Sequence, residues 1–230
     1  MKTIYKSAIT SKEFYDRSEW IDYDNIRASC FVFLVFLPEW KTIIKQNLIE
    51  TAHTLFTPFL ENIVTSLVEP HFNALEGGWG DFCMDTWNIH EDTYDYALEG
   101  KSIASAKYLQ MLQDSKIEVN YDGLGYCKDW DPFWDCILDC IVSHDAPLSN
   151  FHFHDLNHQF YFYFHHTKSI GLVYKEFNDA IKYVLQQSKT ANLEIWDWND
   201  EKNLDKIRGE INYMGKDYWL HRKDMGMMQD

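Results

Sequence analysis

The chain has 230 residues, of which 36 are acidic and 21 basic, and its formal charge is -15 with histidine counted as neutral. This charge argues against nucleic acid as a partner, because affinity for phosphate comes from lysine and arginine side chains. Hydrophobic residues make up 46% and charged residues 25% of the sequence, a balance typical of a folded protein rather than a disordered one.

The sequence predicts neither a membrane span nor a disulfide framework. Its most apolar run, residues 30–37, is far shorter than the roughly 20 residues that a helix needs to cross a bilayer. The first 14 residues lack the pattern of a secretion signal. The 5 cysteines are widely spread, without a CxxC pair. We therefore expect a cytoplasmic protein with reduced thiols and no contact with membranes.

The first elements that the sequence predicts are a strand and a long helical stretch. The apolar run at 30–37 fits a strand buried on both faces or the first turns of a helix, and we favour the strand. From 38 to 68, apolar residues recur at helical spacing, and Pro58 is expected to break or kink the pattern. We therefore expect one kinked helix or two helices there.

Asp131 followed by Pro132 is the clearest helix start in the chain, since it combines a capping carboxylate with a first-turn proline. We expect this helix to end at about residue 144. The other patterns of this region are weaker. They predict strands at 79–89 and 117–121, a helix at 102–112 and a turn at 122–125.

The clearest local pattern lies just after residue 150. Phenylalanine alternates with histidine or tyrosine on both sides of a four-residue connection at 155–158, as is typical of a β-hairpin. Pairing His154 with Gln159 puts all five phenylalanines of 151–164 on one face. The opposite face then carries His152, His154, Tyr161, Tyr163 and His165.

After the hairpin we expect a strand at 169–176, a helix at 178–187 and a last strand at 193–198. These elements predict an α+β fold, with a helical N-terminal part packed on a largely antiparallel sheet. We expect a single domain over 1–230. Within it we distinguish a helical subdomain at 1–75, an α+β part at 76–200 and a loosely ordered C-terminal tail at 201–230.

The histidines of the hairpin are candidate metal ligands. His152 and His154 stand two apart on one strand and would point to the same side, so they could share one zinc ion. Asp155, His158 or His165 could complete the ligand shell, and an open position would hold an activated water. We favour the alternative that these imidazoles face solvent beside the tyrosines, because no complete metal-ligand spacing is present.

Negative charge is concentrated between residues 76 and 145, which hold 15 acidic side chains and four lysines. Three aspartates recur at every fourth position of the expected helix, although like charges at that spacing cost about 0.2–0.5 kcal/mol per pair. One interpretation is a solvated acidic face. The other is a surface that attracts a basic partner and anchors it with aromatic rings. The residues concerned are Asp131, Asp135, Asp139, Trp130 and Trp134.

Most catalytic templates are missing, including the GxSxG, GxxxxGK[ST] and HExxH motifs, so the sequence favours a non-catalytic role without a cofactor. We expect an acidic, aromatic-rich interaction protein that binds a basic protein. Proteins that neutralise a nucleic-acid-cleaving toxin must cover a phosphate-binding cleft with acidic groups. A bacterial immunity protein is therefore the most concrete form of this hypothesis. The alternative is a zinc-dependent hydrolase that uses the histidine-rich hairpin.

Overall fold

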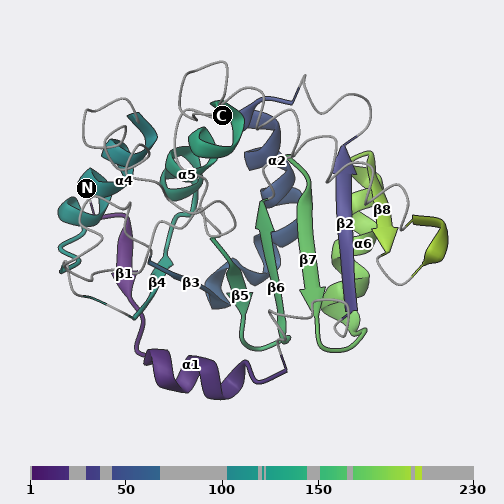
Figure 1. Ribbon diagram of the computed structural model, residues 1–230, viewed down its shortest axis with the longest axis horizontal. Helices are drawn as coiled ribbons and strands as arrows, with labels where there is room; N and C mark the ends of the chain where they lie inside the picture. Colours follow the sequence, from purple (N-terminus) through teal and green to yellow (C-terminus); the bar gives the residue numbers. More distant parts are fainter. Residues whose placement is uncertain are drawn as a thin grey trace, which may run out of the picture.

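The computed structural model describes residues 2–20, 30–36, 43–67, 103–118, 121, 123–143, 151–164, 168–197 and 200–203. These residues form an α+β structure, as the sequence predicts (Figure 1). Its centre is an eight-stranded sheet with the order β1-β4-β3-β5-β6-β7-β2-β8. All neighbouring strands in this order are antiparallel.

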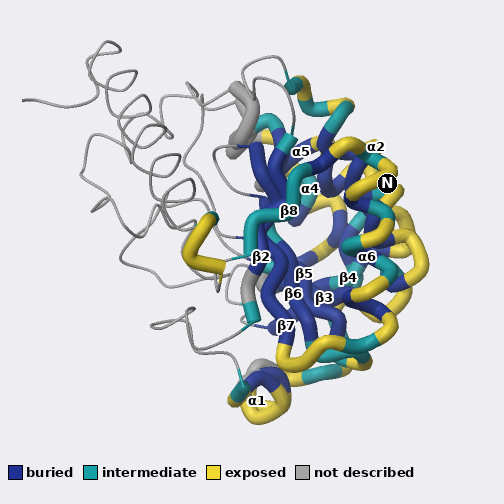
Figure 2. The backbone as a smooth tube through the Cα atoms, turned by 90° about the vertical axis from the view of Figure 1, so that its right-hand side faces the viewer, coloured by how far each residue is buried: buried dark blue, intermediate teal, exposed yellow. Residues whose placement is uncertain are grey.

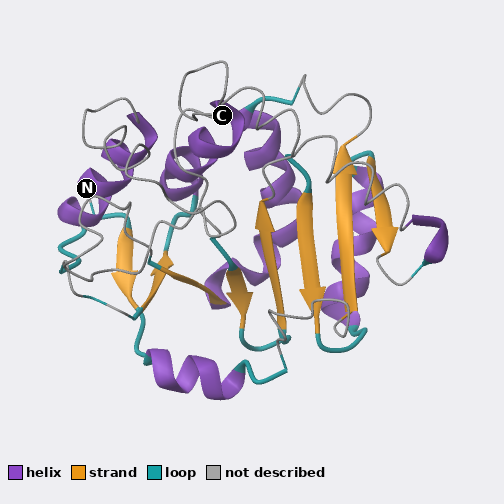
Figure 3. Ribbon diagram, in the orientation of Figure 1, coloured by secondary structure: helices purple, strands orange, loops and turns teal. Residues whose placement is uncertain are grey.

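The described helices and strands, which Figure 3 distinguishes by colour, alternate irregularly along the chain. The strands are β1 (Ile4–Lys6), β2 (Cys30–Phe36), β3 (Ile63–Ser66), β4 (Leu124–Cys127), β5 (Phe153–Asp155), β6 (Phe160–Phe164), β7 (Ile170–Tyr174) and β8 (Leu193–Asp197). The helices are α1 (Ser11–Arg17), α2 (Lys45–Phe56), the 3-10 helix η3 (Thr57–Asn62), α4 (Ile103–Asp114), α5 (Asp131–Ser143) and α6 (Asp179–Thr190).

Helices α2, α4, α5 and α6 lie on one side of the sheet, and the main core fills the space between them and the strands (Figure 2). The β5–β6 hairpin directs its phenylalanines into this core, as the alternation predicts, and Phe56 of α2 stacks on Phe162 with ring centroids 3.6 Å apart. The predicted pairing of His154 with Gln159 is wrong, because His154 lies opposite Tyr161. The offset is two residues, so the same side chains still share a face.

The second face of the sheet is also buried where the hairpin crosses it. Tyr161 is fully buried beside Phe33 and Val173, and Trp20 packs against these residues. Phe14 of α1 contacts the edge of the His154 ring, at a centroid distance of 4.7 Å. The interpretation that His154 and Tyr161 face solvent is therefore wrong.

Two short strands differ from the expected elements. The helical pattern of 38–68 ends earlier, because η3 follows α2 around Pro58 and residues 63–66 form β3. Of the turn expected at 122–125, Gly123 lies in a bend and residues 124 and 125 begin β4, while the described residues of 117–121 are not in a strand. The described residues of 1–75, where a helical subdomain was expected, thus supply three of the strands as well as helices.

Other expectations for the elements agree with the structure or cannot be compared with it. The strand at 30–37 and the helices at 102–112, 131–144 and 178–187 correspond to β2, α4, α5 and α6. The strand expected at 79–89 lies outside the described residues, as does the tail after residue 203. None of the described helices has the length and apolarity of a membrane span.

Candidate functional site

The three aspartates of α5 lie on its outer side, whereas the two tryptophans point into the core. The side chains of Asp131 and Asp135 are 53% and 55% exposed. Trp130 and Trp134 are buried, and Trp134 has no exposed surface. The prediction that these two rings anchor a partner at the surface is therefore wrong.

Helical periodicity explains where the tryptophans lie. Trp130, Phe133, Trp134 and Ile137 follow the i, i+3, i+4, i+7 spacing of a buried helix face, and all four belong to the main core. The Trp130 indole N–H also donates a hydrogen bond to the backbone oxygen of Leu60, at 3.2 Å. Both tryptophans thus fix α5 against the sheet instead of presenting a binding surface.

Two lysines from other helices neutralise one end of the aspartate row. Lys45 of α2 lies 2.8 Å from an oxygen of Asp135 and 2.7 Å from one of Asp139. Lys107 of α4 lies 2.9 Å from the other Asp139 oxygen. Partial burial of Asp139 favours its neutral form, but the hydrogen bonds and charges of both lysines outweigh this effect and lower its pKa. Asp139 therefore joins three helices.

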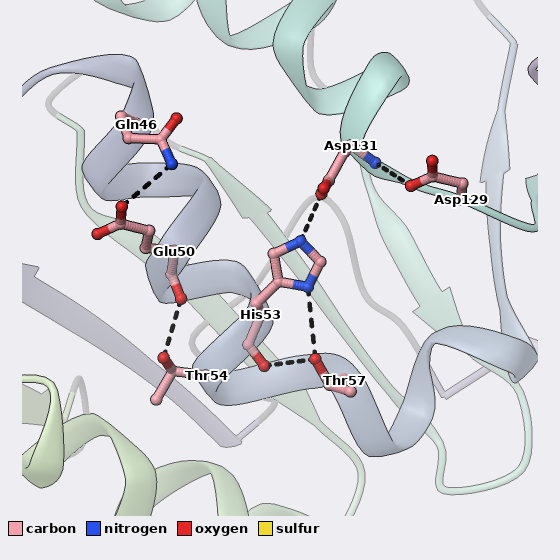
Figure 4. Close-up of polar contacts among 7 residues, drawn as sticks. All are labelled: Gln46, Glu50, His53, Thr54, Thr57, Asp129 and Asp131. Carbon is pink, nitrogen blue, oxygen red and sulfur yellow. Dashed lines mark hydrogen bonds and ion pairs between the residues drawn. The ribbon is translucent and has the colours of Figure 1, made fainter.

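At the other end of the row, Asp131 pairs with His53 of α2 (Figure 4). The Thr57 hydroxyl lies 3.5 Å from the second ring nitrogen of His53. Thr57, His53 and Asp131 thus follow the order of nucleophile, base and carboxylate found in catalytic triads. The hydroxyl, however, donates a 2.7 Å hydrogen bond to the His53 backbone oxygen. The arrangement therefore fits the end of a helix better than an activated nucleophile.

The structure divides the histidine-rich hairpin between two sides of the sheet. His152 and His154 share the second face, with ring centroids 6.0 Å apart. Asp155 points to the opposite face and pairs with His158. His165 lies outside the described residues. The described members of the predicted zinc site are thus not brought together, and the part of the chain that the structure describes contains no group of three potential ligands.

Burial keeps the two histidines of the second face neutral. It lowers the pKa of His152 to about 4, and it lowers the pKa of His154 as well, with the nearby His152 adding to the effect. Their rings pack on that of Tyr161, each with a centroid distance of 5.0 Å. In this setting the imidazoles act as aromatic packing groups at neutral pH.

A groove of about 740 Å³ lies where the β5–β6 turn meets η3 and the start of α6. The buried Asp155 carboxylate organises the turn: one oxygen accepts the backbone N–H groups of Asn157 (2.8 Å) and His158 (3.0 Å). The other oxygen lies 2.9 Å from Nδ1 of His158. We call this cavity the α6 groove; its lining comprises Pro58, Phe59, Asn157, His158, Gln159, Glu176, Asn178, Asp179, Ala180 and Tyr183.

Asn178 joins the turn to α6. Its side-chain oxygen accepts the backbone N–H of Ile181 and caps the helix, while its side-chain nitrogen donates to the His158 backbone oxygen, both at 3.1 Å. No sequence pattern predicted this groove, although a helix was expected to start at Asn178. The only local signal was the pair of carboxylates, Glu176 and Asp179, on either side of the cap.

Comparison with known proteins found no match to a family model, a curated protein or a solved structure. The function is therefore inferred from the two surfaces described above, the outer side of α5 and the α6 groove.

Proposed function

We propose that the chain is an interaction protein that binds a basic protein partner through the outer side of α5, most concretely as an immunity protein that neutralises a bacterial toxin. One observation carries this proposal: Asp131 and Asp135 project more than half-exposed carboxylates from successive turns of a helix whose other side is fixed in the core. Charges held in this way attract a cationic surface with little ordering cost.

The internal lysines limit which aspartates can serve this role. Lys45 and Lys107 gather around Asp139, which is only 25% exposed. Asp139 therefore has a structural role. Lys45 also offsets part of the charge of Asp135, but the more exposed carboxylates lie toward the amino-terminal half of α5. Asp129, which is exposed and precedes the helix, adds to these carboxylates. The contact surface that we propose is thus Asp129, Asp131 and Asp135.

Co-purification from the native host tests this proposal, with the wild-type chain and two matched double variants as baits. Asp131→Asn/Asp135→Asn removes two charges from α5, whereas Asp16→Asn/Glu19→Gln removes two exposed charges in and just after α1. We expect the wild type and the α1 variant to retain a basic protein that the α5 variant loses. Equal retention of that protein by all three baits, or a captured protein that is not basic, would contradict the proposal.

The alternative of a zinc-dependent hydrolase that uses the histidine-rich hairpin gains no support from the described residues. His152 and His154 are separated from Asp155 and His158 by the sheet, and we do not propose that activity.

A further inference from the structure

The carboxylates of the α6 groove differ from those of α5 in their partners. Every aspartate of the α5 row has a cationic or imidazole partner. Glu176 and Asp179 are exposed and have no ion-pair partner among the described residues. The described lining of the groove contains these two carboxylates and neither lysine nor arginine. The groove therefore offers negative charge that the fold itself does not use.

Aromatic rings form the walls beside these carboxylates. Phe59 is buried, lines the groove and meets the rings of His158 and Tyr183 edge-on, at centroid distances of 5.3 and 5.7 Å. The hydrogen bond to Asp155 fixes the His158 ring in this position. A guanidinium group is planar, so it can stack on such rings while its N–H groups bind a carboxylate in pairs.

We infer that the α6 groove binds an arginine side chain of the basic protein partner. This inference rests on the proposed function for the identity of the partner, but the groove itself can be tested without that partner. A volume of about 740 Å³ exceeds one side chain and leaves room for the adjoining backbone of the bound segment. Phe177, which lies between the lining residues Glu176 and Asn178 in the sequence, is 63% exposed.

The amino terminus of α6 opposes a cation, because the helix dipole places about half a positive charge there. Two features limit this effect. Asn178 already satisfies one free N–H of the first turn, and Glu176 and Asp179 add two full negative charges at the same end. The sum of these charges favours a cation over an anion in the groove.

Two capped tripeptides test the inference on the intact chain: acetyl-Gly-Arg-Gly-amide and the same peptide with citrulline in place of arginine. Citrulline keeps the shape of the side chain and removes its charge. We expect the arginine peptide to shift the backbone amide NMR signals of residues 157–159 and 176–183 in a saturable way. The citrulline peptide should bind about tenfold more weakly or not at all.

Variants locate the site. Glu176→Gln/Asp179→Asn should weaken binding of the arginine peptide about tenfold, whereas Asp16→Asn/Glu19→Gln should leave it unchanged. If the groove variant folds poorly, the comparison of the two peptides on the wild-type chain still tests whether the groove binds arginine. The inference is overturned by equal binding of both peptides, by no saturable shift, or by shifts confined to α5.

The outcome also separates this inference from the proposed function. If a native partner depends on the α5 charges but the arginine peptide does not bind, the inference about the groove is refuted and the proposed function stands. If the arginine peptide binds selectively but the chain retains no basic protein, the proposed function is refuted and the groove remains an arginine site.

Discussion

Lys45 of α2 binds Asp139 of α5, with Nζ 2.7 Å from Oδ1, and it also reaches Asp135. Partial burial acts to lower the pKa of Lys45, but the hydrogen bonds and charges of the two aspartates together outweigh it and raise the pKa. Replacing Lys45 with Met leaves two like charges one turn apart. We expect the free energy of unfolding to fall by about 1 kcal/mol.

Urea denaturation measures this change, and Lys182→Met is the matched control, because Lys182 is exposed on α6 and has no ion pair among the described residues. The control should stay within about 0.5 kcal/mol of the wild type. An equal loss of stability in both variants would mean that Lys45 does not join the helices.

His152 makes the protein sensitive to acid. Burial lowers its pKa in the folded chain to about 4, and its ordinary value in the unfolded chain is near 6.5. The unfolded state therefore binds more protons between these values, so stability is full above about pH 7 and decreases as the pH falls toward 4. For this residue alone the loss reaches about 3 kcal/mol.

The free energy of unfolding of the wild type and of His152→Phe, measured between pH 7 and pH 4, tests this prediction. Groups that titrate in both proteins cancel in the difference between the two curves. Phe keeps a ring beside Tyr161 and Tyr163. The variant should lose about 3 kcal/mol less than the wild type over this range. Parallel curves would show that His152 does not titrate with folding.

Local patterns predicted much of the fold, while contacts between distant residues decided the rest. Asp131 before Pro132 marked the start of α5, and alternation placed the hairpin phenylalanines correctly. β3 and β4 have four residues each and are held by pairing with distant strands, so no local pattern specifies them. Short strands of this kind depend on tertiary context.

The candidate site was harder to predict than the fold. Lys45 lies 90 residues before Asp135, and only the packing of α2 on α5 brings the two together. The α6 groove likewise joins three separate parts of the chain. The burial of Trp130 and Trp134, in contrast, was visible in their helical spacing with Phe133 and Ile137.

Trp134 is expected to stabilise the fold and not to contact the partner. Its side chain is fully buried, with its ring 5.4 Å from that of His53 between centroids. Trp134→Ala should lower the free energy of unfolding by about 3–5 kcal/mol, because the cavity adds to the lost burial. Thermal melting measures the change, and Trp134→Phe should cost less. A stable Ala variant with a selective loss of binding would contradict this role.

Asp155 should matter more for stability than its partner His158. The Asp155 side chain is fully buried and accepts from two backbone N–H groups, whereas the His158 side chain is 41% exposed. Asp155→Ala should cost about 2–3 kcal/mol, since it leaves those donors unsatisfied. His158→Ala should cost less than 1 kcal/mol, on the order of an exposed pair. Similar losses in chemical denaturation would argue against the turn described above.

The association rate of the chain with its purified partner, measured over a salt series, tests the proposed function most directly. Attraction between exposed charges is screened over about 8 Å at physiological ionic strength. Asp131→Asn/Asp135→Asn should therefore associate more slowly than the wild type at low salt and show a weaker salt dependence, while Asp16→Asn/Glu19→Gln should follow the wild type. An unchanged rate for the α5 variant at every salt concentration would contradict the account, because the outer side of α5 would then be only a solvated acidic face.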